Sequence, residues 1–317
     1  MKVVIIGGTG HVGTYLVPRL VEAGYRVVCV TRGESEPYLP HAAWNVVERV
    51  QIDRTEAEQA GTFGEQIAAF EPDIVIDMIC FTLESCQHIV DALRGRVEHF
   101  LHCGTVWIHG HSTVVPVTED APRQPFGEYG IQKSAVERYL MKEARLNGFP
   151  ATALHPGHIV GPGHTPINPQ GNKNNDVFEI LARGDILSLP NIGMETVHHV
   201  HADDVAQAFM LAIANWRVAV GESFHTVSPG AITLRGFAHA SSAWFNQEAN
   251  LTFMGWEDWR KTVPENIAAA TWDHIAHSPN ASIEKARRML GYEPRYTSLQ
   301  AVKESVDWLV EHEQIKI

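Results

Sequence analysis

The sequence lacks any run of 18 consecutive apolar residues, which excludes a transmembrane helix. Basic side chains are scarcer than acidic ones, 25 against 37, and the net charge of −12 argues against proteins that coat nucleic acid and against polybasic membrane binders. Only four cysteines are present, and none has the spacing of a metal site: Cys29, Cys80, Cys86 and Cys103. The first apolar run, 3–6, is too short for a signal-peptide core, so we expect a cytoplasmic protein with reduced thiols.

Apolar stretches rich in β-branched residues alternate with helical patterns along the chain. The expected strands are Val3–Ile6, Val27–Val30, Ile74–Ile76 and Phe100–Cys103. The expected helical segments are 12–23, 67–70, 89–93, 129–144, 205–214, 282–290 and 299–310. Asp203 or Asp204 is the expected N-cap of the helix at 205–214. Because parallel strands need crossover connections, this alternation predicts an α/β fold with a doubly wound parallel sheet.

A glycine-rich segment follows the first expected strand directly. Gly7, Gly8, Gly10 and Gly13 fit both G-x-G-x-x-G and G-x-x-G-x-x-G. Glycines there allow a tight turn and close approach of the backbone to a pyrophosphate, whose charge is stabilised by the N-terminus of the next helix. A position between a strand and a helix is the context in which this motif marks a dinucleotide site. The expected cofactor contacts from this segment are Gly7, Gly10, His11, Val12 and Gly13.

The motif and the strand pattern together predict two domains. Residues 1–165 should form a Rossmann-type dinucleotide-binding domain, to which residues about 200–228 return. A polar, turn-rich loop follows at 164–176. Residues 166–317 should form mostly a smaller α/β substrate-binding domain.

The residue that ends the second expected strand discriminates between NAD and NADP. An acidic residue there would bind the ribose hydroxyls of NAD, whereas this chain has Arg32, whose guanidinium suits a 2′-phosphate. This favours NADP slightly over NAD; the alternative is a solvated surface arginine. Asp53 follows a short apolar stretch and is a candidate contact to the adenine edge, with a simple loop carboxylate as the alternative.

Tyr129 and Lys133 are four residues apart on an expected helix, so they share one face. A free tyrosine has a pKa of about 10 and is a poor base at neutral pH. A neighbouring ammonium and an oxidised nicotinamide both favour the phenolate, as a general base for hydroxyl deprotonation requires. The pair alone is common by chance, but with the glycine loop upstream it predicts catalysis at a hydroxyl group.

The glycine loop and the Tyr129/Lys133 pair resemble the short-chain dehydrogenase/reductase superfamily. The length and the segment 285–294 resemble its extended branch, the NAD-dependent epimerase/dehydratase family. Family members carry a Ser or Thr at a strand end before the tyrosine, and here that position is Thr105.

Two further segments carry the same resemblance. The segment 155–162 resembles the family's loop beside the nicotinamide, which implies a cofactor contact from Pro156, and 200–206 resembles another recurrent segment. By contrast, Asp77–Cys80 departs from the small residues that the family usually places beside the cofactor.

The resemblance implies a mechanism. Thr105 would hydrogen-bond the substrate hydroxyl, and Tyr129 would remove its proton while a hydride passes to the nicotinamide. Lys133 would hold the cofactor ribose and lower the pKa of Tyr129. Dehydratases usually carry Asp-Glu after the threonine; here Val106 and Trp107 stand there, which disfavours dehydration. The resemblance also implies a homodimer joined through the helix after Tyr129 and the one near 85–93.

The expected substrate follows from a difference between this chain and the family members that act on nucleotide-diphosphate sugars. Relatives acting on nucleotide-diphosphate sugars often carry arginines before the His-x-Asp-Asp segment and near the C-terminal helices. The corresponding segments here, 194–199 and 273–278, contain no arginine, and Glu195 would repel phosphate. We therefore expect a sugar, sugar acid or similar polyol. Asn168, in an asparagine-rich loop, and His158 are the expected substrate contacts besides Thr105.

Histidine is abundant, with 18 residues, several of them in clusters. We predict no metal site, because the proposed chemistry needs none and histidines in a substrate pocket or core explain the pattern. Three functions stay open. The first is an NAD(P)-dependent oxidoreductase or epimerase acting on a polyol. The others are a nucleotide-sugar 4-epimerase and a dinucleotide-binding sensor, or RNA-associated relative, without turnover.

Overall fold

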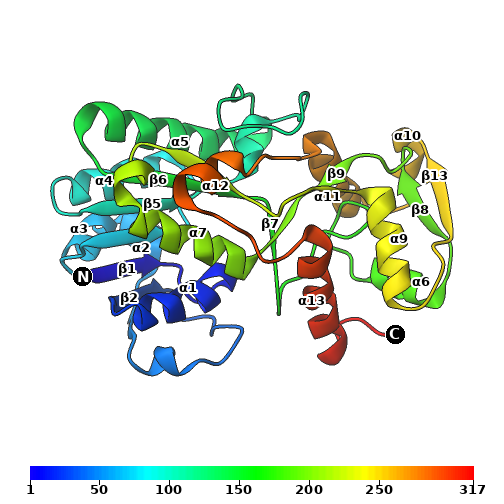
Figure 1. Ribbon diagram of the computed structural model, residues 1–317, viewed down its shortest axis with the longest axis horizontal. Coiled ribbons are helices and arrows are strands. Elements are labelled where there is room, and N and C mark those ends of the chain that lie inside the picture. The colour runs from blue at the N-terminus through cyan, green and yellow to red at the C-terminus, as the bar shows by residue number, and fades with distance from the viewer.

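A seven-stranded parallel sheet forms the larger lobe of the protein, whose computed structural model describes all residues, Met1–Ile317. Its order is β11-β6-β5-β4-β1-β2-β3 (Figure 1). The strands are β1 Lys2–Ile6, β2 Arg26–Thr31, β3 Glu48–Gln51, β4 Ile74–Asp77, β5 His99–Cys103, β6 Ala151–Pro156 and β11 Ser223–Thr226. This is the predicted Rossmann-type sheet, and its central strands are buried on both faces, as their β-branched sequences require.

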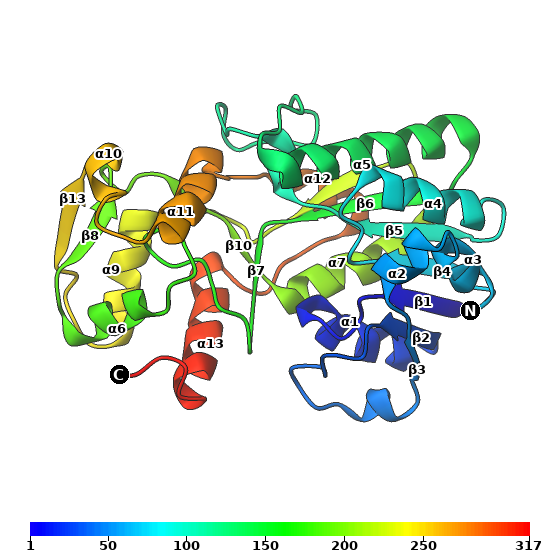
Figure 2. The same cartoon turned by 180° about the vertical axis from the view of Figure 1, so that it is seen from behind.

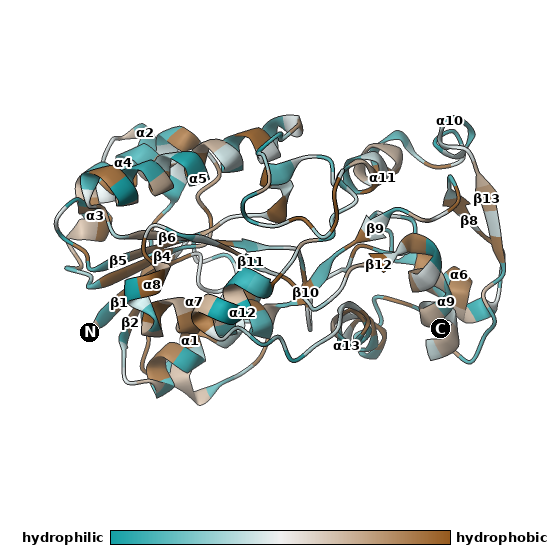
Figure 3. Ribbon diagram, turned by 45° about the horizontal axis from the view of Figure 1, so that its top comes forward, coloured by the Kyte–Doolittle hydropathy of each residue, from teal (hydrophilic) through white to brown (hydrophobic).

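Helices cover both faces of the sheet and bury one apolar cluster against each. One cluster contains residues of α1 His11–Glu22, α7 Ala202–Ala214 and α12 Glu284–Leu290. The other contains residues of α3 Phe63–Ala68, α4 Leu83–Leu93 and α5 Gly127–Asn147. The short elements of this lobe are η1 Ala42–Asn45, α2 Arg54–Gln59, η2 Val106–His109 and α8 Trp216–Ala219. Figure 3 shows both brown and teal segments along these helices, as expected of helices with one buried side.

The second lobe is built from short strand pairs and five helices. The pairs are β7 His158–Val160 with β10 His199–His201, β8 Leu187–Pro190 with β13 Leu251–Met254, and β9 Thr196–Val197 with β12 Ile232–Thr233. The helices are α6 Asp176–Arg183, α9 Leu234–Trp244, α10 Trp256–Trp259, α11 Glu265–His277 and α13 Ser298–Glu311. Figure 2 shows α13 beside β7 and β10, the strands that run between the lobes. None of the helices combines the length and apolar character needed to span a membrane.

The start of α7 differs from the expected cap. Its N-cap is His201, whose Nδ1 accepts a hydrogen bond from the Asp203 backbone N–H at 3.1 Å. The carboxylate of Asp203 pairs instead with Arg19 and Arg295. Asp204 accepts hydrogen bonds from the backbone N–H groups that lead into α13. Both aspartates therefore bind the segment that leads into α13, and the adjacent histidine caps the helix.

Candidate active site

The glycine loop joins β1 to α1 and has the shape that a dinucleotide requires. Gly7 lies at a φ of +83°, a left-handed conformation that favours glycine. A Cβ on Gly13 would lie 1.9 Å from the carbonyl oxygen of Gly8, so only glycine fits there. α1 begins after Gly10 without a side-chain cap, which leaves the N–H groups of its first turn free for an anion. The residues present therefore fit the diphosphate of a dinucleotide.

A cavity of about 440 Å³ lies beside this loop and suits an adenosine group. Its lining includes Ile6, Val30, Thr31, Arg32, Ile52, Arg54, Thr55, Ile79, Phe81 and Ser85. Arg32 is exposed and forms an ion pair of 2.9 Å with Glu34. Asp53 does not line the cavity; its carboxylate accepts a hydrogen bond from the Glu56 backbone N–H and caps α2. The structure thus gives Asp53 the role of a helix cap.

The predicted catalytic residues meet above the carboxyl ends of β4 and β5. Thr105 caps η2, where its hydroxyl accepts a hydrogen bond from the Trp107 backbone N–H at 3.3 Å, and it lies close enough to Tyr129 to influence the pKa of that phenol. Tyr129 lies in the first turn of α5, and Lys133 is one turn further on. The buried Lys133 ammonium donates hydrogen bonds to the carbonyl oxygens of Cys80 at 2.8 Å and Cys103 at 2.7 Å. One N–H of Lys133 stays free for another acceptor, such as a ribose hydroxyl.

The acidity of Tyr129 differs from the expectation of a lowered pKa. The side chain is 42% exposed, yet desolvation by the surrounding protein raises its pKa to about 12. The nearby Thr105 side chain opposes this rise in the Tyr129 pKa only in part. Lys133 is held on two carbonyl oxygens, with its Nζ 6.0 Å from the centre of the Tyr129 ring, and burial lowers the pKa of Lys133 as well. In the structure, Tyr129 is therefore a protonated phenol at neutral pH.

Aromatic and imidazole rings pack near Tyr129 and are called the histidine wall below: Trp107, His158, His274 and His277. Trp107 stacks on His277 with ring centres 4.0 Å apart, and His274 meets Trp107 edge-on at 5.3 Å. Burial lowers the pKa of both histidines to about 4. The ring centres of His158 and His274 are 5.0 Å apart. Neither ring nitrogen of His158 has a hydrogen-bond partner within the protein. The wall thus offers uncharged hydrogen-bonding groups at neutral pH, His158 among them.

Asn168 occupies a different environment from the expected one. Its amide nitrogen donates to Asn172 at 2.7 Å and to the carbonyl oxygen of Asn174 at 2.9 Å. Its oxygen accepts from the backbone N–H groups of Gln170 and Asn172. All four hydrogen-bonding positions of the amide serve the loop itself, which leaves none for the expected substrate contact.

The remaining predicted site residues lie at the start of α1, in the apolar core and at the end of β6. His11 begins α1 and stacks on Tyr38 at 3.9 Å, whereas the Val12 side chain belongs to the apolar core. Pro156 ends β6 and is buried. No three metal-binding side chains gather anywhere in the chain. Of the clustered histidines, His198 hydrogen-bonds to the carbonyl oxygen of Ser228 at 2.9 Å and His199 to that of Ile167 at 3.1 Å.

Sequence reasoning missed two parts of the site. The Arg54 side chain, which lines the cavity beside the glycine loop, belongs to no recognisable motif, although the Asp77 that binds it departs from the small residues usual in the family. Glu137 lies one turn after Lys133 on α5 and contacts His155 behind Thr105. Its spacing of four residues from Lys133 and eight from Tyr129 is the signal that could have pointed to it.

Comparison with known proteins places these features in a family. The model of the NAD dependent epimerase/dehydratase family matches residues 3–225. The 2′-dehydrokanamycin reductase of Streptomyces kanamyceticus is 30% identical over 228 residues, which make up 72% of this chain and 62% of the reductase. The chain thus spans less than two thirds of that relative's length.

Two further similar proteins cover nearly the whole chain. The UDP-glucose 4-epimerase of Corynebacterium glutamicum is 23% identical over 331 residues, 96% of this chain and 94% of that protein. The structure of UDP-glucuronic acid 4-epimerase from Bacillus cereus in complex with NAD matches with a TM-score of 0.74 and 16% identity. The match covers 98% of this chain and 99% of that one, which shows the shared fold.

Proposed function

The chain belongs to the NAD-dependent epimerase/dehydratase family, and we propose that it is an NAD(P)-dependent oxidoreductase or epimerase. Its substrate is a secondary hydroxyl of a sugar, sugar acid or similar polyol. The observation that carries this proposal is that Thr105, Tyr129 and Lys133 lie together: Thr105 influences the pKa of Tyr129, and Lys133 Nζ lies 6.0 Å from the centre of the Tyr129 ring. A non-catalytic dinucleotide sensor would not need these three side chains together.

Each catalytic residue has one task. A bound nicotinamide dinucleotide would supply the acceptor or donor of the hydride. During oxidation the Tyr129 phenolate takes the proton of the substrate hydroxyl, and during reduction the phenol returns it to the carbonyl oxygen. The Thr105 hydroxyl holds the same substrate oxygen next to Tyr129. Lys133 is fixed by the carbonyl oxygens of Cys80 and Cys103, and its remaining N–H would bind a ribose hydroxyl of the cofactor.

The lining of the substrate side supports a polyol. His158 is uncharged at neutral pH and neither of its ring nitrogens has a partner within the protein, so it presents one donor and one acceptor of the kind that hydroxyl groups bind. Lys173 lies close enough to lower the pKa of His11 and His164, and its ammonium suits the carboxylate of a sugar acid.

We propose NADP as the preferred cofactor, with NAD as the alternative. Arg32 lines the adenosine cavity, and its guanidinium would exchange Glu34 for a 2′-phosphate. The NAD bound in the epimerase from Bacillus cereus supports the alternative.

A nucleotide-sugar 4-epimerase is the second candidate, favoured by the UDP-glucose 4-epimerase of Corynebacterium glutamicum. The histidine wall argues against it, because neutral imidazoles replace the guanidinium groups that a diphosphate favours.

The first experiment identifies the nucleotide released from freshly purified, denatured protein by mass spectrometry. Tightly retained NAD would support a closed redox cycle, as an epimerase needs, and would contradict the NADP preference. Protein without nucleotide would support a dehydrogenase that exchanges its cofactor. Titration with NADPH and NADH and a panel of inositols, aldohexoses and aldonates would follow. Turnover of UDP-glucose but of no panel member would favour the second candidate instead.

A further inference from the structure

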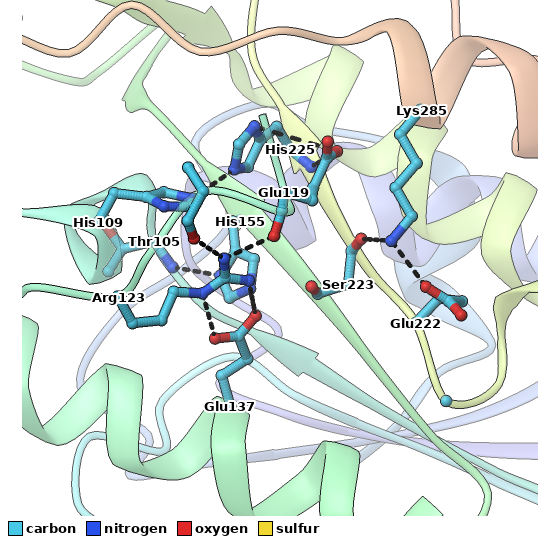
Figure 4. Close-up of polar contacts among 12 residues, drawn as sticks. Thr105, His109, Glu119, Arg123, Glu137, His155, Glu222, Ser223, His225 and Lys285 are labelled. Carbon is cyan, nitrogen blue, oxygen red and sulfur yellow. Dashed lines mark hydrogen bonds and ion pairs between the residues drawn. The ribbon is translucent and has the colours of Figure 1, made fainter. Parts of the chain in front are cut away.

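Behind the Thr105 loop, a glutamate and a histidine make a buried contact that the chemistry described above does not use. We propose that Glu137 and His155 are a positioning pair that fixes the Thr105 hydroxyl relative to the Tyr129 hydroxyl. Figure 4 shows His155 between Thr105 and Glu137. This inference rests on the proposed function, because it assigns Thr105 to the substrate oxygen. Neither residue of the pair would touch the substrate.

The contact between His155 and Thr105 is direct and fixes the proton on the imidazole. The Thr105 backbone N–H donates a hydrogen bond to His155 Nδ1 at 3.1 Å. Nδ1 is therefore the unprotonated nitrogen, and the ring proton lies on Nε2. A Cβ on Gly104 would lie only 2.1 Å from Nδ1, so the imidazole packs directly against this peptide. The ring thus sets the position of the Thr105 backbone.

Glu137 holds the other side of the imidazole. The Nε2 atom of His155 lies 3.3 Å from Glu137 Oε1 and donates its proton to it. Arg123 binds both carboxylate oxygens of Glu137, at 2.6 Å and 2.9 Å, and also donates to the carbonyl oxygens of Glu119 and Ala121. Burial alone would raise the pKa of Glu137, but hydrogen bonds from Arg123 and His155 hold it well below its usual range. The anchor is thus a fixed carboxylate at all working pH values.

Helix α5 links Thr105 and Tyr129, the two residues expected at the substrate oxygen. Tyr129, Lys133 and Glu137 lie at intervals of four residues on α5, so they follow one side of it. Tyr129 therefore comes from the helix itself, while Thr105 is held to the same helix through His155 and Glu137. Because a displacement of about 1 Å can lower a rate 100-fold, such a rigid link bears on catalysis.

The test replaces His155 by residues that keep or remove its Nδ1 acceptor. His155→Asn places an amide oxygen near the position of Nδ1, whereas His155→Leu removes both ring nitrogens. We expect His155→Leu to lower kcat at least about 10-fold with unchanged cofactor Kd, and His155→Asn to recover most of that loss. The substrate is the panel member that the wild type turns over. His99→Leu is the control, because His99 is equally buried on β5 and pairs with Thr152.

A double-mutant cycle separates positioning from general destabilisation. In a Thr105→Val background the hydroxyl is absent, so His155→Leu should lower kcat by less than about 2-fold further. An equal loss of kcat in both backgrounds, or an equal loss in His99→Leu, would overturn the inference.

A spectroscopic measurement tests the pair without turnover. ¹⁵N NMR should show His155 protonated on Nε2 alone, and the Thr105 amide should exchange slowly in the wild type and rapidly in His155→Leu. Protonation on Nδ1 would overturn the inference. If the wild type turned over no panel member with either cofactor, the proposed function would fail. The NMR result would then test, independently of activity, whether His155 accepts the hydrogen bond of the Thr105 amide.

Discussion

Arg54 and Asp77 form a bidentate ion pair inside the sheet lobe, with Nη1 of Arg54 at 2.8 Å and 3.0 Å from the two carboxylate oxygens of Asp77. Asp77 is fully buried at the end of β4, and Arg54 also donates to Glu58 at 2.7 Å. Burial alone would lower the pKa of Arg54, but the Asp77 carboxylate raises it above its ordinary value. The pair ties α2 to the centre of the sheet, and Arg54 also lines the cavity beside the glycine loop.

Removing one partner of this ion pair should destabilise the protein strongly. Asp77→Ala removes the fully buried counter-charge of the Arg54 guanidinium and leaves only the partly exposed Glu58, so we expect a loss of about 3 kcal/mol in the free energy of unfolding. Urea denaturation measures this loss. Glu65→Ala is the control, because Glu65 forms an exposed ion pair with Arg96 and should cost no more than about 1 kcal/mol. Equal losses of unfolding free energy in the two variants would contradict the expectation that a buried ion pair costs more to break than an exposed one.

The second prediction concerns Tyr129 as the proton-transfer residue. Tyr129→Phe should lower kcat about 10²–10⁴-fold while cofactor affinity and melting temperature stay near those of the wild type. Because the surrounding protein raises the pKa of Tyr129 to about 12, the phenolate fraction grows with pH throughout the working range. The oxidation rate should therefore rise between about pH 7 and 9, and the reduction rate, which uses the phenol, should stay nearly flat. Steady-state kinetics in both directions measure this, and a falling oxidation rate would argue against Tyr129 as the base.

Arg32 should decide the choice of cofactor. Arg32→Ser removes the guanidinium from the adenosine cavity, and we expect the Kd of NADPH to rise about 10- to 100-fold, with little change for NADH. Fluorescence titration with each nucleotide gives both constants. Arg26→Ser, at an exposed arginine earlier on β2, is the matched control. Equal weakening of both nucleotides by Arg32→Ser would indicate a general role of Arg32 in the loop.

The buried histidines predict sensitivity to acid. Burial lowers the pKa of His99 and His199 to about 3 and of His198 to about 4, whereas all three return to about 6.5 when the chain unfolds. The unfolded chain therefore binds more protons between about pH 4 and 6.5. The contribution of these neutral histidines to the free energy of unfolding is fully present above that range and is lost as the pH falls through it.

Each such histidine contributes a slope of up to about 1.4 kcal/mol per pH unit within that range. Calorimetry from pH 5 to 7 should show a melting temperature that rises with pH and an uptake of several protons on unfolding. His99→Phe should reduce the uptake at pH 5 by about one proton. No change in uptake would mean that His99 is already protonated in the folded protein.

The sequence by itself determined the parts of this protein that depend on local patterns. Glycine spacing after an apolar strand predicted the turn at Gly7 and the close packing of Gly13, because both follow from backbone conformation within seven residues. Hydrophobic periodicity predicted most helices and the parallel sheet, although the cap of α7 was wrong because distant arginines bind Asp203. The spacing of Tyr129 and Lys133 likewise placed both on α5.

Only the tertiary structure decided how individual side chains are used. Asn168 and Asp53 look free in the sequence, yet their hydrogen-bonding groups are taken up by a loop and by a helix start. Glu137 and His155 contact each other only because α5 packs against β6, which brings the two residues together. Desolvation likewise depends on what packs around a group, so the raised pKa of Tyr129 emerged from the folded environment. Local conformation is encoded by neighbours along the chain, whereas burial and partners are set by segments far apart in the sequence.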